Sequence, residues 1–331
     1  MVRWWPRPIP ADREHVTVQH PILSRLATGR PLLVSADPEA SFRARGVGLK
    51  GPASVGRLLR EQPTEAAEHY HQEIIAGVDV LCALTAETLP RALGQIGMPF
   101  RAAALTGSAV ELALEAVDGA PRPIVVAGVL GSSQVLPTAP DRMTEDLAMH
   151  ATRLAAAGCE LLLARGYAQP SSEPGLSRLA RRAAVVSAAA TQLPTWAVIE
   201  LSESGTTGDG ETIEDAAHAA AEAGAQVVLM EVPGLACAPA LLERARRAVP
   251  GLAIGVAPGV GVGIGTVAGE SGVIVHDRAA EADAWARGAK LLIDAGARII
   301  GGGPGTTARH ISALSALLRG GERQSFWPRA G

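Results

Sequence analysis

The chain has 331 residues, of which 47% are hydrophobic and 19% are charged, and its formal net charge is −3. This composition is typical of a folded globular protein and excludes a disordered one. Since the charge is nearly balanced and no long basic run occurs, we expect no nucleic-acid partner. No apolar run is long enough to cross a bilayer, so we expect no membrane partner either.

Short apolar runs alternate with helical patterns along most of the chain. After an expected N-terminal extension (1–30), the runs that predict strands are 31–36, 78–84, 123–128, 160–164, 195–200, 226–231, 252–257 and 297–301. They are continuously apolar, as expected for strands covered on both faces. Between them lie Ala-rich helical stretches such as 64–77, 144–158, 212–224 and 279–296. Thr212 with Asp215 forms a capping-box pattern, and glycines such as Gly77 and Gly158 are placed to end helices.

Eight strand–helix units in about 300 residues are what a (β/α)8 barrel requires. We therefore predict an α/β fold with a single TIM-barrel domain over 31–319 and a C-terminal tail over 320–331. A doubly wound open sheet is the structural alternative. The segment 258–272 carries a near match to the dinucleotide fingerprint, but it follows no first strand of a βαβ unit, so we interpret it as a plain loop.

In such a barrel the chemistry lies at the carboxyl ends of the strands. The candidate side chains there are Asp37, Glu87, Arg165, Glu200, Glu203 and Glu231, followed by a glycine-rich turn that includes Gly302, Gly303 and Thr306. Each acid could instead be a solvated loop residue or a helix cap. That alternative is weakest for Glu200 and Glu231, because each ends an otherwise apolar strand, where an unpaired charge is costly.

The stretch GARIIGGGPGTTARHISAL (296–314) resembles the terminal signature of the homocysteine S-methyltransferase family, which contains Gly-Gly-Cys-Cys-Gly-Thr followed by His-Ile. AGVDVLCALTAET (76–88), AAGCELLLARG (156–166), GDGETIEDAA (208–217) and GAQVVLMEV (224–232) are similar to other family segments, in the same order. The resemblance covers nearly the whole chain. It implies the same barrel fold.

The chain departs from the family where the family binds zinc. The resemblance places the three zinc cysteines at Val232, Gly303 and Pro304, and none of these can supply a ligand. A family Glu falls on Arg165, an Asn on Leu84 and an Asp on Ser35, with Asp37 two residues on. We therefore expect no zinc and no cofactor. An oxygen-rich site for Mg²⁺ or Mn²⁺ between Glu200 and Glu231 stays open as the alternative. A free thiol is mostly protonated near pH 7, so the usual activation of homocysteine is lost.

We predict a divergent, zinc-independent member that transfers a methyl or one-carbon group and acts on a small amino-acid-like or onium compound. The resemblance favours such donors. The acids Glu87, Glu200, Glu203 and Glu231 suit a cationic end, and Arg165 could hold a substrate carboxylate. Backbone N–H groups of the glycine turn could favour an anion, although a tight barrel-closing turn explains the glycines equally well.

Two alternatives remain open. One is a lyase or hydrolase with Glu231 or Glu200 as the catalytic base. The other is an inactive barrel that binds a ligand or supports a partner enzyme. Three widely spaced cysteines, Cys82, Cys159 and Cys237, and an N-terminus without a signal-peptide pattern predict a cytoplasmic protein. The sequence permits a homo-oligomer but does not require one.

Overall fold

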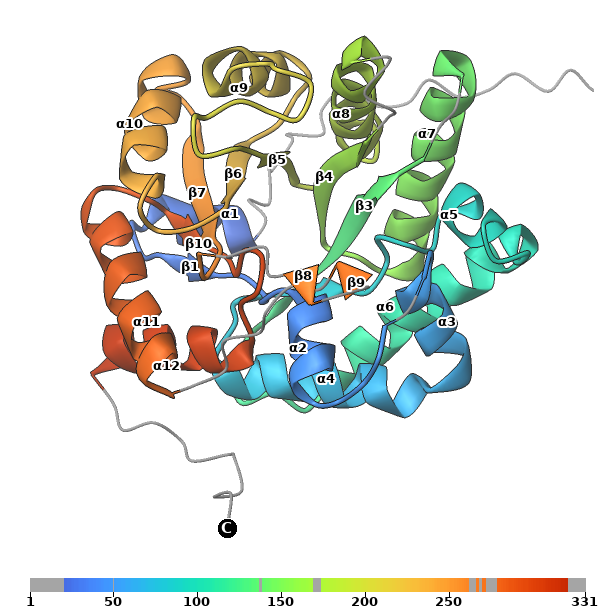
Figure 1. The fold of residues 1–331 in the computed structure, drawn as a ribbon, viewed down its shortest axis with the longest axis horizontal. Helices are drawn as coiled ribbons and strands as arrows, with labels where there is room; N and C mark the ends of the chain where they lie inside the picture. Colours follow the sequence, from blue (N-terminus) through green and yellow to red (C-terminus); the bar gives the residue numbers. More distant parts are fainter. Residues whose placement is uncertain are drawn as a thin grey trace, which may run out of the picture.

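A computed structural model of the chain describes residues 21–49, 51–136, 139–168, 174–261, 266–267, 270–271 and 279–320. Its eight parallel strands surround a central axis, and helices cover them on the outside (Figure 1). The strands are β1 (Leu32–Leu33), β2 (Val80–Ala83), β3 (Val125–Val135), β4 (Leu161–Ala168), β5 (Thr195–Glu200), β6 (Val227–Val232), β7 (Ala253–Pro258) and β10 (Ile299–Ile300). Each lies within or overlaps a predicted strand, so the predicted (β/α)8 barrel is confirmed.

The sheet closes between its first and second strands. Its order is β1-β10-β7-β6-β5-β4-β3-β2, and a parallel bridge between Val34 and Val80 joins the two ends. Asp79 N–H donates to Leu33 O at 2.7 Å, and Ser35 N–H donates to Val80 O at 3.2 Å. This closure excludes the doubly wound open sheet, which has two free edges.

The helices follow the strands in the expected alternation. They are α1 (Pro21–Ala27), α2 (Pro38–Ala44), α3 (Ser54–Glu61), α4 (Pro63–Ala76), α5 (Pro90–Gly94), the 3₁₀ turn η1 (Pro99–Arg101), α6 (Ala102–Asp118), α7 (Pro140–Ala157), α8 (Pro174–Ala189), α9 (Ile213–Glu222), α10 (Ala238–Ala248), α11 (Ala279–Asp294) and α12 (Ala308–Arg319). Thr212 caps α9 by accepting from Asp215 N–H. Gly77 and Gly158 end α4 and α7 in the left-handed conformation that glycine adopts without strain.

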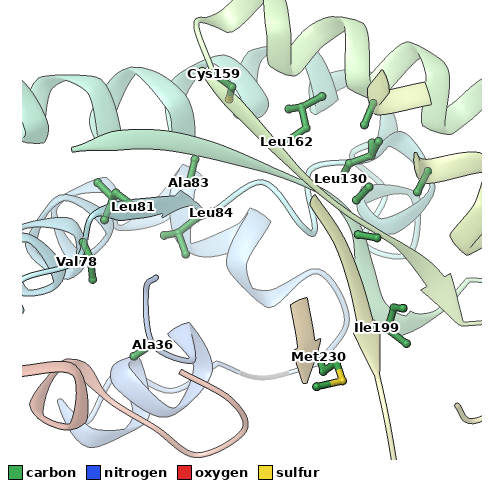
Figure 2. Close-up of a cluster of buried hydrophobic side chains, with 14 of the residues drawn as sticks. Ala36, Val78, Leu81, Ala83, Leu84, Leu130, Cys159, Leu162, Ile199 and Met230 are labelled. Atoms are coloured by element: carbon green, nitrogen blue, oxygen red, sulfur yellow. The ribbon is translucent and has the colours of Figure 1, made fainter. Parts of the chain in front are cut away.

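Side chains alternate between two apolar layers. The inner layer fills the barrel and includes Val80, Leu163, Trp196, Val198 and Leu229. The outer layer packs the strands against the helices, and Figure 2 shows part of it, including Leu81, Leu162, Ile199 and Met230. Because successive side chains of a strand point to opposite faces, this alternation fixes which residues at the strand ends point inward.

Two parts of the chain lie beside the barrel proper. Helix α1, within the predicted N-terminal extension, buries Ile22 and Leu26 against the inner layer. Within the predicted loop 258–272, β7 ends at Pro258, and β8 (Thr266–Val267) pairs antiparallel with β9 (Glu270–Ser271). Residues 262–265, 268–269 and 272, with most of the fingerprint-like pattern, lie outside the described part of the chain. Among the described helices, none is long and apolar enough to cross a membrane.

Candidate functional site

Three charged side chains meet inside the barrel at the carboxyl ends of β4, β5 and β6, a region called the barrel mouth below. Side chains two residues apart on a strand point to the same face. Each of the three charged residues lies two positions after a residue of the inner layer, so all three point inward. The inner-layer residues are Leu163, Val198 and Leu229. The backbones of Glu200 and Glu231 are paired directly across β5 and β6.

Arg165 forms a direct ion pair and hydrogen bond with Glu231 through its Nη2 and the Glu231 Oε1. Its Nη1 lies 3.9 Å from Glu200 Oε2. The structure thus brings the three side chains together. It also shows Arg165 and Glu231 in contact, as expected for a mutually neutralising pair rather than for two groups held apart at opposite ends of a ligand.

The charges of this group are unequally buried. The side chains of Arg165 and Glu231 are 20% and 17% exposed, whereas that of Glu200 is 68% exposed. Burial lowers the pKa of Arg165, but the attraction of Glu231 and then Glu200 outweighs burial and raises this pKa above its usual value. Burial, followed by repulsion from Glu231, raises the pKa of Glu200, and water screens part of this effect. One arginine and two glutamates leave the group with an excess negative charge.

Asp37 ties the β1–α2 turn to the glycine-rich turn after β10. Its carboxylate accepts from Gly305 N–H at 3.0 Å and from Glu39 N–H at 2.9 Å, the latter as the N-cap of α2. Its own N–H donates to Thr306 Oγ1 at 3.3 Å. Burial raises the pKa of Asp37 to about 6, although these N–H groups oppose the rise. Asp37 therefore joins the loop after β1 to the loop after β10.

The glycine-rich turn uses its own hydrogen-bonding groups within the protein. Pro304 has no N–H, and each of the other six N–H groups from 301 to 307 donates to a protein acceptor. The acceptors, in chain order, are Val256 O, Ser35 O, Pro258 O, Asp37 Oδ2, Gly303 O and His310 Nδ1. The Thr306 hydroxyl is fully buried and donates to Gly303 O at 2.7 Å. The N–H groups of Gly302, Gly303 and Thr306, which were expected to face an anion, thus all donate within the protein. The barrel-closing turn accounts for them.

Two predicted acids lie away from the three-residue group. Glu87 accepts from Val55 N–H at 2.8 Å, so it satisfies the N-terminus of α3, whose N-cap residue Ala53 has no capping side chain. Burial raises the pKa of Glu87, and the Val55 N–H partly offsets this rise. Glu203 is exposed in the loop after β5. The helix-cap alternative therefore explains Glu87.

A further acid beside the mouth was not among the predicted site residues. Glu73 of α4 is completely buried, and its Oε2 accepts from Ala36 N–H at 3.0 Å. Burial raises its pKa to about 7, against the hydrogen bonds from Ala36 and Ser35. In the sequence, a glutamate within a helical pattern indicates a solvent-exposed position. The burial of Glu73 therefore becomes apparent only from the packing of α4 behind β1.

The positions that the resemblance gives to zinc do not fit a metal. Val232, Gly303 and Pro304 carry no donor atom. A Cβ at Gly303 would meet the main chain of Ala257, Pro258 and Gly259, with Gly259 N only 2.6 Å away. Among the described residues, no three His, Cys, Asp or Glu side chains form a group that could hold a metal ion.

Comparisons with known proteins agree with this architecture. The homocysteine methyltransferase MmuM from Escherichia coli, in its metallated form, has a similar structure with a TM-score of 0.72 and 20% sequence identity, covering 90% of this chain and 99% of that one. Its oxidised form gives a TM-score of 0.69 and 21% identity, covering 87% and 96%. No curated protein matches the sequence significantly. The sequence profile of the family described as homocysteine S-methyltransferase matches residues 32–318. The chain therefore belongs to the homocysteine S-methyltransferase family.

Proposed function

We propose that this protein is a zinc-independent member of its family that transfers a methyl or one-carbon group from a small cationic or zwitterionic compound. The observation that carries the proposal is the inward-facing group of Arg165, Glu200 and Glu231 at the end of an otherwise apolar barrel. An excess carboxylate beside apolar walls is complementary to an onium centre, which is both cationic and apolar.

Glu200 is the residue placed to meet the positive end of the ligand. Its side chain is 68% exposed, and its Oε2 lies 3.9 Å from Arg165 Nη1. Arg165 is engaged by Glu231, so a ligand carboxylate would have to compete with Glu231 for the guanidinium. Because Glu200 is accessible and Arg165 is already paired, the site favours a cation, or a zwitterion whose carboxylate displaces Glu231.

The acceptor is proposed to differ from homocysteine bound as a zinc thiolate. Val232, Gly303 and Pro304 supply no ligands, and the main chain occupies the space beside Gly303. Without such activation only a few per cent of a thiol with a pKa of about 8.5 is ionised near pH 7. We expect methylation of homocysteine from S-methylmethionine or betaine by metal-free protein to be far below ordinary enzyme turnover of about 1–10 per second. Turnover in that range would refute this part.

The binding proposal is tested by thermal shift and calorimetry with S-methylmethionine, betaine, choline and the neutral tert-butyl analogue of choline. We expect the cations to bind and the neutral analogue to bind at least about tenfold more weakly, a difference of about 1.4 kcal/mol. Glu200→Gln should remove this preference, while Glu203→Gln, an exposed acid of the adjoining loop, serves as the matched control. Equal binding of the charged and neutral compounds would contradict the proposal.

An inactive barrel is the second candidate, because the direct Arg165–Glu231 contact is what a purely structural pair would form. In that case none of the four compounds would shift the melting temperature. A lyase or hydrolase with Glu200 as base is compatible with the raised pKa and exposure of this residue. It would be recognised by cleavage of the ligand without transfer of its methyl group.

A further inference from the structure

Three arginine side chains gather at the amino-terminal end of the barrel, around the turn from α4 to β2. Arg25 belongs to α1, Arg122 lies shortly before β3, and Arg319 ends α12. These three are called the arginine cluster below. Asp79, directly before β2, is the acid beside Arg25 and Arg122. Since Asp79 and Arg122 precede their strands, the cluster lies at the opposite end of the barrel from the mouth, and the proposed function makes no use of it.

Asp79 is already neutralised by one member of the cluster. Its side chain is 7% exposed, its Oδ2 accepts from Leu33 N–H at 2.9 Å, and its Oδ1 accepts from Arg25 Nη2 at 2.6 Å. Arg122 Nη1 approaches the same Oδ1 only to 3.6 Å, which is beyond hydrogen-bond distance. Among the described residues, Arg122 therefore has no acid in hydrogen-bond contact.

Arg122 and Arg319 both donate to the end of α4. Arg122 Nη2 donates to Ile74 O at 3.2 Å, and Arg319 Nη2 donates to Gly77 O at 3.1 Å. These carbonyls lie in and directly after the last turn of one helix, so the two guanidinium groups are neighbours. A helix C-terminus carries about half a negative charge, which is less than the two positive charges brought to it. Burial, then repulsion from Arg319, accordingly lowers the pKa of Arg122.

The cluster retains hydrogen-bond donors that the described part of the protein does not use. Each guanidinium has five N–H groups. Arg122 Nη1 is buried without a hydrogen-bond acceptor, and Arg319 donates through Nη2 alone. The side chains of Arg25 and Arg122 are 32% and 21% exposed, and Arg319 is exposed, so a small solute can reach the cluster. Neighbouring guanidinium groups with unused donors are complementary to an oxyanion, above all to a phosphate group.

We propose that the arginine cluster binds a phosphate group, free or in a small phosphate ester, between Arg122 and Arg319, with Arg25 at the edge of the site. The bound group would join α12 and the segment before β3 to the turn between α4 and β2. This turn lies beside the place where the Val34–Val80 bridge closes the barrel. Binding should therefore stabilise the folded chain against unfolding. The site does not depend on the proposed function.

Thermal unfolding and calorimetry of the full chain test the site. Near pH 7.5 and at constant ionic strength, chloride is replaced stepwise by inorganic phosphate or by glycerol 3-phosphate. We expect a saturable rise in melting temperature, and Arg319→Gln should weaken the apparent affinity at least about tenfold. Arg287→Gln is the matched control, because Arg287 is exposed on α11 and has no recorded ion pair among the described residues. It should leave the affinity unchanged. Tighter binding of glycerol 3-phosphate than of phosphate would identify an ester as the ligand.

Comparison with the variants is essential, because phosphate and sulfate stabilise many proteins through exclusion from their surfaces. Equal rises in melting temperature for the natural protein and Arg319→Gln would overturn the proposal and leave the arginines as caps of α4 and partners of Asp79. The absence of a saturable heat of binding for both phosphate compounds would overturn it as well. Arg122→Gln is the second variant, and if it does not fold, Arg319→Gln and the calorimetry decide. No onium compound enters these measurements, so their failure is distinguishable from failure of the cations to bind at the mouth.

Discussion

Arg165 lies close to both glutamates of the barrel mouth. It lies against Glu231 and 3.9 Å from Glu200, and its pKa is raised by both despite its burial. Removing one partner of a largely buried pair leaves the other charge unpaired, which costs more than removing both. The pair can therefore be dissected by stability measurements even before a ligand is known.

We expect Arg165→Ala and Glu231→Gln each to lower the free energy of unfolding by about 2–4 kcal/mol, with the double variant destabilised by much less than the sum. Urea denaturation of the four proteins measures this coupling. Lys290 and Asp294 form an exposed ion pair on α11 and provide the control, for which the coupling should be below about 1 kcal/mol. Additive effects at Arg165 and Glu231 would show that the contact contributes little in solution.

Asp37 should make stability depend on pH between about 4 and 6.5. Its folded pKa of about 6 lies above the ordinary 3.8, so the native state binds the proton more tightly than the unfolded state does. The contribution of Asp37 protonation to the free energy of unfolding is fully present below pH 3.8 and is lost as pH rises through 6. Relative to Asp37→Asn, the natural protein should lose about 1–2 kcal/mol over this range, less than full linkage gives because the side chain is only half-buried. Parallel unfolding curves at all pH values would contradict this expectation.

At the scale of elements, the turn after β10 is held by its neighbours more than by its own sequence. Its N–H groups reach β7, the end of β1 and Asp37, and Trp285 of α11 donates to Pro258 O at 3.0 Å beside it. Close approach of main chains from β7 and the turn leaves no room for side chains. Glycine at 303 is required for this reason.

Gly303→Ala should destabilise the protein by roughly 2–4 kcal/mol, because its Cβ would overlap the main chain of Ala257 and Gly259. Gly107→Ala is the matched control, since that glycine lies inside α6 with nothing within 4 Å of an added Cβ. The control should be neutral or stabilising by about 0.5–1 kcal/mol. Thermal unfolding of the two variants decides the matter, and a tolerated alanine at 303 would mean that the turn has room for a side chain.

At the scale of the whole molecule, a family-type zinc site would need ligands from β6 and the β10 turn to converge. Here those places carry Val232, Gly303 and Pro304. We expect purified protein to hold well below one zinc per chain, and chelator treatment to leave its melting temperature unchanged. Elemental analysis and thermal unfolding with and without chelator test this. About one tightly held zinc per chain would require a different ligand set and would refute zinc independence.

The sequence by itself determined the barrel and the inward direction of its charged strand ends. Eight continuously apolar runs separated by helical patterns permit few other folds, and strand alternation places Arg165, Glu200 and Glu231 in the lumen. What only the tertiary structure decided depends on contacts between distant segments. These include the capping of α3 by Glu87, the use of the glycine turn's N–H groups by the protein itself, and the burial of Glu73 behind β1. Hydrogen bonds and desolvation at those places are set by which elements pack together, and no local pattern of residues encodes that.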